Sequence, residues 1–183
     1  MKKFDTNQGL IGGNEKVEIS IEDYDPSWPD CFEHHARLIR DALGNAVIEL
    51  EHIGSTSITG LAAKPIIDIL LVVEDSGDED SYLPRLEALG YELRVREPDF
   101  HEHRMLRTPE KDVHIHVFSP DSPEIERYLI FRDQLRTNDS DRARYRRVKR
   151  ELARQTWTNM NAYADAKEEV IEDIIARARR ERE

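Results

Sequence analysis

Residues 65–73 read PIIDILLVV and form the most apolar run of the chain. The length of this run and its content of β-branched residues predict a strand buried on both faces, in the interior of a sheet. Asp68 interrupts the apolar pattern in the middle of the run. A carboxylate in such surroundings is costly unless it is paired or protonated. Asp68 therefore needs a metal ion, hydrogen bonds, or a cation such as Lys64, with which it would form a buried ion pair that fixes the sheet.

A second polar pattern lies further along the chain, at Asp112-x-His114-x-His116. On a strand, residues two positions apart point the same way, so these three side chains share one face while the residues between them enter the core. Two imidazoles at this spacing can bind one divalent metal ion. They can equally form a polar sheet face without any ligand, and the motif alone leaves both interpretations open.

Outward from these two strands, the apolar periodicity predicts an α+β fold, a mixed β-sheet flanked by helices with a helical C-terminal third. Ser27 is the expected N-cap of the first helix, which Gly44 ends. We expect a flexible tail over residues 1–14 and one domain over 15–183, with the sheet body at about 15–120 and the helical part at about 121–183. The expected strands are 17–21, 46–53, 65–73, 91–95, 105–108 and 112–118, and the expected helices are 28–43, 81–89, 124–136, 140–157 and 161–181.

The charge balance restricts the classes of partner. The 183 residues carry a net charge of −11, which disfavours general binding to nucleic acid or to an anionic membrane. Residues 142–154 invert this balance, with seven basic residues and one acid. This segment is either a solvated helix face beside acidic neighbours or a clamp for a triphosphate or an RNA end.

The chain offers no sign of secretion or membrane insertion. The single Cys31 excludes an intrachain disulfide and a zinc site with several cysteines. No apolar run approaches the ~18 residues that span a bilayer. We therefore expect a cytoplasmic, acidic protein, and the excess of carboxylates would also suit a high-salt cytoplasm.

A cluster of glycine and hydroxyl residues, Gly54-Ser55-Thr56-Ser57, lies between the strand at 46–53 and the run at 65–73. Such a cluster either presents N–H and hydroxyl donors to a phosphate or forms an ordinary turn. Gly54-Ser55, a gap of twelve residues and then Asp68 in an apolar strand resemble the active-site signature of the nucleotidyltransferase superfamily, which has the polymerase β-like fold.

From about residue 17 to 175 the chain resembles the GrpB family more closely, a group of uncharacterised members of that superfamily. The matching stretches are Trp28-Pro29 with Phe32, residues 52–57 (HIGSTS), residues 60–69 (GLAAKPIIDI), Gly90-Tyr91, residues 114–117 (HIHV), residues 131–133 with 135–136, Tyr145 with Lys149, and Tyr163 with Lys167.

The resemblance implies a metal-assisted phosphate site. Asp68 would be the catalytic carboxylate and a ligand of a divalent metal. Leu70 occupies the superfamily's second acidic position, and the third falls near His114 or His116. One carboxylate with two imidazoles suits Mn²⁺ or Zn²⁺ better than Mg²⁺. The residues implied to bind phosphate or nucleotide are Gly54, Ser55, Lys64, Arg132 and Lys149.

Three functions are compatible with these residues. The first is an enzyme that transfers a nucleotidyl or phosphoryl group with a divalent metal. The second is a catalytically degenerate domain that binds a nucleotide or supports a partner enzyme, as when the family's domain is fused to dephospho-CoA kinase. The third is a purely structural role for an Asp68–Lys64 pair.

The expected partner is a nucleotide or a phosphorylated small molecule. RNA at residues 142–154 and a second copy of the chain are further candidates, and no membrane partner is expected. The metal hypothesis makes one geometric prediction: Asp68, His114 and His116 converge beside the Gly54-Ser55 turn.

Overall fold

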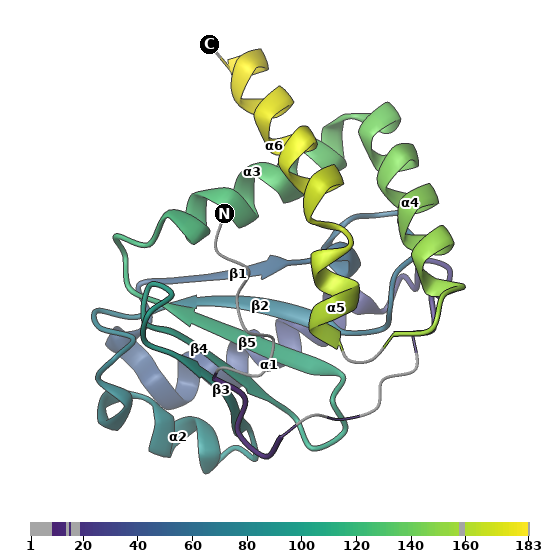
Figure 1. Cartoon of the computed structure of the whole chain (residues 1–183). Coiled ribbons are helices and arrows are strands. Elements are labelled where there is room, and N and C mark those ends of the chain that lie inside the picture. The colour runs from purple at the N-terminus through teal and green to yellow at the C-terminus, as the bar shows by residue number, and fades with distance from the viewer. Residues whose placement is uncertain (1–8, 14, 16–18, 158–159, 183) are drawn as a thin grey trace.

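A mixed five-stranded sheet forms the centre of the computed structural model, which describes residues 9–13, 15, 19–157 and 160–182 (Figure 1). The strand order is β1-β2-β5-β4-β3. The strands are β1 (Glu49–Ile53), β2 (Ile67–Val72), β3 (Glu92–Glu97), β4 (His103–Arg107) and β5 (Val113–Phe118). The α+β class predicted from the sequence is confirmed.

The apolar run around Asp68 forms the interior strand β2, as its composition predicts. β2 pairs antiparallel with β1 and parallel with β5. This register sets Asp68 opposite Ile53 on one side and opposite His114 on the other. The sequence patterns on β2 and β5 are thereby brought into direct contact.

Helices cover both faces of the sheet (Figure 1). One face packs against α1 and α2, and the other against α3, on which α4 and α6 lie. The helices are α1 (Trp28–Leu43), α2 (Leu83–Glu87), α3 (Pro123–Thr137), α4 (Asp139–Ala153), α5 (Met160–Asp165) and α6 (Glu168–Arg182).

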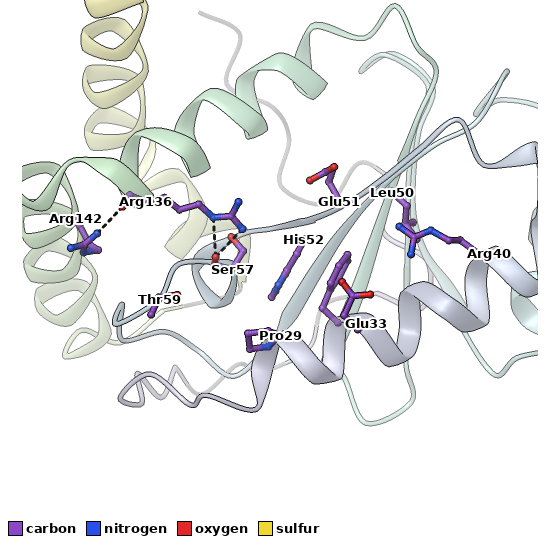
Figure 2. Close-up of a pocket in the computed structure, with 11 residues that line it drawn as sticks. Pro29, Glu33, Arg40, Leu50, Glu51, His52, Ser57, Thr59, Arg136 and Arg142 are labelled. Atoms are coloured by element: carbon purple, nitrogen blue, oxygen red, sulfur yellow. Dashed lines mark hydrogen bonds between the residues drawn. The ribbon is translucent and has the colours of Figure 1, made fainter.

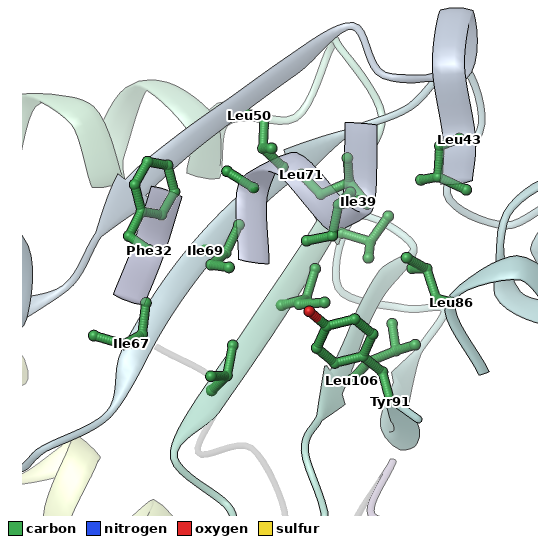
Figure 3. Close-up of a cluster of buried hydrophobic side chains, with 14 of the residues drawn as sticks. Phe32, Ile39, Leu43, Leu50, Ile67, Ile69, Leu71, Leu86, Tyr91 and Leu106 are labelled. Carbon is green, nitrogen blue, oxygen red and sulfur yellow. The ribbon is translucent and has the colours of Figure 1, made fainter. Parts of the chain in front are cut away.

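The largest apolar cluster lies between α1 and the sheet (Figure 3). Phe32, Ile39 and Leu43 recur at helical spacing on α1 and pack on Ile69 and Leu71, which alternate along β2. Alternate residues of β2 and β5 therefore enter this core, and the residues between them face the helical C-terminal third. Asp68, His114 and His116 belong to the second set.

The start of α1 lies where the sequence predicts it. Ser27 occupies the N-cap position before Trp28, and Pro29 lies in the first turn. Ser27 adopts helical backbone angles, φ −81° and ψ −14°, and its side chain makes no capping hydrogen bond. Its own N–H donates to Asp25 Oδ1 at 2.8 Å. The predicted position is therefore confirmed, but the side chain does not cap the helix.

Several predicted elements differ in extent; the helix predicted at 140–157, for example, ends at Ala153, and the strand predicted at 46–53 begins at Glu49. Of the strand at 17–21, residues 17 and 18 lie outside the described residues and 19–21 form no strand; an isolated bridge joins Glu22 to Ala63 instead. The helix at 81–89 reduces to α2, preceded by a 3₁₀ turn over Glu79–Ser81. The helix at 161–181 is divided into α5 and α6 at residues 166–167. Neither Gly nor Pro marks this break, so periodicity alone could not reveal it.

Part of the N-terminal segment contacts the sheet edge. Leu10 forms an isolated bridge with Val95 of β3, and the Arg94 guanidinium donates hydrogen bonds to the carbonyl oxygens of Ile11 and Gly13. The remaining residues of the predicted tail, 1–8 and 14, lie outside the described residues. Among the described helices, none is both long and apolar enough to cross a membrane.

Candidate metal centre

Asp68, His114 and His116 come together on the sheet face opposite α1. Oδ1 of Asp68 lies 3.7 Å from Nδ1 of His114 and 3.6 Å from Nε2 of His116. One ligand atom from each of the three residues lies within 4.8 Å of the other two. The side chains are 27%, 17% and 19% exposed, in that order, so the cluster is half-buried but reachable from solvent. Their convergence follows from the parallel pairing of β2 with β5.

Gly54 closes the cluster on the β1 side. Its φ of +72° and ψ of −177° are accessible essentially to glycine alone. A Cβ atom at this position would lie 2.3 Å from Oδ2 of Asp68 and 2.9 Å from its Cγ. The absence of a side chain at residue 54 therefore allows the loop to lie directly against the Asp68 carboxylate.

The hydroxyl residues after Gly54 form a 3₁₀ turn over Ser55–Ser57 rather than the start of an α-helix. Ser57 donates its hydroxyl proton to Gly54 O at 2.7 Å, and Thr56 donates to Ile66 O at 2.8 Å. These two hydroxyls fix the turn. Burial raises the pKa of Tyr145 on α4 and nearby Ser55 acts in the opposite direction, so Ser55 lies where the turn meets the helical third.

Lys167 of the helical third provides positive charge near the cluster, and Lys149 lies near Lys167. Lys149 of α4 is 2% exposed and donates a hydrogen bond to Ala62 O at 2.6 Å. Burial lowers the pKa of Lys149 to about 7, and the charge of Lys167 is the next largest cause. Burial also lowers the pKa of Lys167 to about 8, although the Asp68 charge acts in the opposite direction. The Lys167 ammonium lies over the Tyr163 ring, 4.4 Å from its centroid. The sequence did not lead us to assign Lys167 to the site. The one feature of the sequence that pointed to Lys167 was its pairing with Tyr163 in the resemblance to the GrpB family.

The polar neighbours keep Asp68 ionised. Burial by itself raises the pKa of this carboxyl group, but its interactions with His116, His114 and Lys167 outweigh burial, and the pKa lies below its usual value. Burial lowers the pKa of His114 to about 4, so this imidazole is neutral at neutral pH. Ionised carboxylate and neutral imidazole are the forms that bind metal ions.

Lys64 does not neutralise Asp68 by direct contact. Among the described residues, no ion pair within 4.0 Å joins Lys64 to Asp68, whose partners at that range are the two imidazoles. The buried Asp68–Lys64 pair proposed as the structural alternative is therefore not formed, although the charges are close enough for Asp68 to act on the pKa of Lys64, which burial lowers.

Arg132 lies elsewhere and is already engaged. Its guanidinium donates to Glu51 Oε2 at 2.6 Å, to Asp133 Oδ1 at 2.8 Å and to the carbonyl oxygen of His52 at 3.2 Å. The structure therefore does not bring Arg132 to the Asp68 cluster, and its predicted role in phosphate binding stays a prediction.

The basic segment at 142–154 is largely paired with protein groups. Arg144 contacts Asp173 at 2.8 Å, Arg150 contacts Asp23 at 3.1 Å, and Arg146 donates to Gly60 O at 2.7 Å. These contacts favour the interpretation of a helix face neutralised by its surroundings. Lys149 is the member of the segment that is directed inward, where its ammonium is buried against Ala62 O and the Tyr145 ring.

Comparison with known proteins decides the family. The family model described as GrpB protein matches residues 18–177. The chain belongs to the GrpB family. A crystal structure of the conserved protein GrpB from Enterococcus faecalis superposes with a TM-score of 0.77 at 34% identity, covering 87% of this chain and 96% of that one.

Relatives of this GrpB-family chain occur both alone and as part of longer proteins. The UPF0157 protein BH1888 of Halalkalibacterium halodurans is 54% identical, with 88% of this chain and 83% of that protein covered. The UPF0157 protein SCO7215 of Streptomyces coelicolor is 51% identical over 94% and 91%. A protein named dephospho-CoA kinase in Mycolicibacterium paratuberculosis is 27% identical over 89% of this chain but 46% of its own length.

This GrpB-family protein also has a separate cavity of about 760 Å³ on the other side of β1, between α1 and the start of α4 (Figure 2). The Phe32 and His52 rings stack in it with centroids 4.7 Å apart, and Arg136 reaches across to donate to Ser57 O. Its lining includes neither Asp68 nor the two cluster histidines. Ser57 connects the two regions, because it belongs to the turn that also contacts the metal-ligand cluster.

Proposed function

We propose that this protein binds a nucleotide or another phosphorylated small molecule through one divalent metal ion at Asp68, His114 and His116. The observation that carries the proposal is the convergence of one ionised carboxylate and two imidazoles within 4.8 Å of one another. Ligand atoms from three side chains that converge on one point are the arrangement by which proteins hold a divalent cation.

The residues present fit such an ion. One carboxylate oxygen and two imidazole nitrogens are a donor set suited to Zn²⁺ or Mn²⁺, and three protein ligands leave coordination positions open for water or phosphate oxygens. A bound divalent ion would polarise a phosphoryl oxygen and offset its negative charge. Partial exposure of all three side chains gives a phosphate access to them.

Lys149 and Lys167 would hold the phosphate oxygens that face away from the metal ligands. Burial lowers the pKa of both ammonium groups. A bound anion would raise these pKa values again and so favour the charged form of each lysine. Gly54, which has no side chain, lies directly against the Asp68 carboxylate, and Ser55 follows it in the turn that meets the helical third. In this arrangement the sheet supplies the metal ligands and the helical third supplies the phosphate ligands.

Group transfer is the further step of the proposal. The superfamily's second acidic position is Leu70, which is fully buried, so the cluster offers one carboxylate where two-metal chemistry uses two or more. A single-metal site favours binding over transfer. The 27% identity to a protein named dephospho-CoA kinase supports the alternative of a nucleotide-responsive domain that assists a partner enzyme.

Calorimetric titration tests the proposal. ATP and CTP are titrated into the protein with and without Mn²⁺ or Zn²⁺, and we expect binding that depends on the metal. Asp68→Asn is expected to abolish this metal-dependent binding. Asp112→Asn is the matched control, since Asp112 lies just before β5 but accepts a hydrogen bond from Thr108, at 2.6 Å, outside the cluster. Equal affinities for wild type and Asp68→Asn would refute a metal role; conversion of ATP with an acceptor would identify transfer.

A further inference from the structure

His116 has a second polar neighbour on the side of its ring that faces away from Asp68. Nδ1 of His116 lies 3.1 Å from Nε2 of His103, and Nδ1 of His103 lies 2.7 Å from Oε2 of Glu97. The three residues lie on the adjoining strands β5, β4 and β3, and Glu97 and His103 are direct partners in the β3–β4 register. They form a continuous chain of hydrogen bonds that ends at the candidate metal centre.

His103 is held in one orientation. It is 7% exposed, and its ring lies nearly parallel to the rings of Phe118 and His116, with centroids 4.7 Å and 5.4 Å away. Each of its ring nitrogens has a polar partner, the Glu97 carboxylate at Nδ1 and the His116 ring at Nε2. A neutral imidazole carries one ring proton, on one nitrogen or the other.

The distances along the chain determine where the protons lie. A contact of 2.7 Å between Glu97 and His103 requires a proton, which the ionised carboxylate lacks, so Nδ1 of His103 bears it. Nε2 of His103 is then an acceptor, and the 3.1 Å contact requires the proton of His116 to be on its Nδ1. Nε2 of His116 is left with its lone pair, 3.6 Å from Asp68 Oδ1, which is too long for a hydrogen bond.

We propose that Glu97 and His103 are positioning residues that fix the tautomer of His116, so that its Nε2 lone pair faces the cation site formed with Asp68 and His114. The proposal rests on the metal site under Proposed function. Residues that hydrogen-bond the second nitrogen of a metal-binding histidine set its orientation and tautomer, and replacing them weakens metal binding by about 10- to 100-fold. Sequence reasoning gave no role to either residue, because the chain forms only when three strands pair.

Nitrogen-15 NMR of the metal-free protein at pH 7.5 tests the tautomer directly. Chemical shifts of the two His116 ring nitrogens distinguish the tautomers, and we expect a protonated Nδ1 and an unprotonated Nε2. A proton on Nε2 in the wild-type protein would overturn the proposal. This measurement needs no metal, so its result stands even if the metal site itself proves wrong.

Titration with Zn²⁺ alone tests the consequence for binding. We expect His103→Phe, which keeps the aromatic stack but removes both hydrogen bonds, to weaken Zn²⁺ binding by about 10- to 100-fold. Glu97→Gln keeps the size of the side chain while removing its charge, and is expected to weaken binding less and to mix the two His116 tautomers. Glu92→Gln, at the exposed start of the same strand, is the control and should bind as the wild type does.

The outcomes separate this inference from the proposed function. Absence of Zn²⁺ binding by the wild-type protein would remove the metal site, while the NMR result would still decide the tautomer. Wild-type affinity in both His103→Phe and Glu97→Gln would overturn the positioning role and leave the metal site intact. If His103→Phe fails to fold, the Zn²⁺ affinity of Glu97→Gln and the NMR measurement of the His116 tautomer decide whether Glu97 and His103 position His116.

Discussion

Gly54→Ala is the substitution that most directly links the fold to the candidate site. The new Cβ atom would lie 2.3 Å from Oδ2 of Asp68 and 2.9 Å from its Cβ and Cγ, all well inside van der Waals contact. The backbone cannot relieve this overlap easily, because φ of +72° with ψ of −177° is itself unfavourable for alanine. Either the loop or the Asp68 carboxylate must move.

Comparison with Gly60→Ala separates the effect of the steric overlap on stability from the effect of the backbone strain. Gly60 has a similar φ of +76°, but a Cβ atom there meets nothing within 4 Å. Gly60→Ala therefore carries backbone strain alone, about 1 to 2 kcal/mol. Gly54→Ala adds crowding of about 1 to 3 kcal/mol to strain of about 1 to 3 kcal/mol. The entropy that alanine removes from the unfolded chain is the same in both variants and cancels between them.

We expect Gly54→Ala to be at least about 1 kcal/mol less stable than Gly60→Ala, which for a chain of this size lowers Tm by about 2 to 4 °C. Thermal unfolding followed by circular dichroism measures this difference, and Zn²⁺ titration of both variants measures the site. Zn²⁺ binding should be lost in Gly54→Ala and kept in Gly60→Ala. Equal Tm values together with unchanged Zn²⁺ affinity would refute the close approach of Gly54 to Asp68.

Three further substitutions test the surrounding charges. The pKa of Lys149 is about 7 in the folded protein against 10.5 for a free lysine, so between these values the unfolded chain holds the extra proton. The free energy of unfolding of the wild type, minus that of Lys149→Met, should therefore rise by up to about 1.4 kcal/mol per pH unit between pH 7 and 9, as measured by urea unfolding. A difference that does not change with pH would contradict the lowered pKa of this lysine. Arg132→Met should cost about 0.5 to 1.5 kcal/mol, because the hydrogen bonds to Glu51 and to the carbonyl oxygen of His52 are lost while Glu51 stays partly exposed, and should leave ATP affinity unchanged; weakened ATP binding at full stability would instead support its predicted phosphate role. Arg147→Glu changes a side chain that is 70% exposed, so stability should move by less than about 0.5 kcal/mol and ATP binding should not respond; a large loss of ATP affinity would restore the basic helix as a clamp.

Local patterns predicted most of the elements. The apolar run at 65–73 indicated an interior strand, and the alternation around His114 and His116 indicated a strand with one polar face. The periodicity of α1 gave its extent from Trp28 to Leu43. These patterns are readable from the sequence because each depends on residues a few positions apart, whose relative directions the backbone geometry fixes.

Element ends and breaks were harder to predict. Ser27 takes the predicted N-cap position without capping the helix through its side chain, and α5 and α6 separate next to Lys167, whose ammonium lies over the Tyr163 ring. The residue type of Ser27 does not show whether its side chain caps the helix, and neither Gly nor Pro marks the break between α5 and α6.

The sequence by itself determined the residue types of the Asp68, His114 and His116 cluster, their strands and the face of the sheet that each side chain takes, because strand alternation is a local property. Only the tertiary structure decided that Asp68 faces two imidazoles rather than the Lys64 ammonium, since the β2–β5 register sets which side chains meet. It also decided that Arg132 is held by carboxylates on the β1 side, and that Lys167 and the Glu97–His103 pair lie beside the cluster. These residues come from distant parts of the chain, and their proximity follows from strand order and helix packing, which no local pattern encodes.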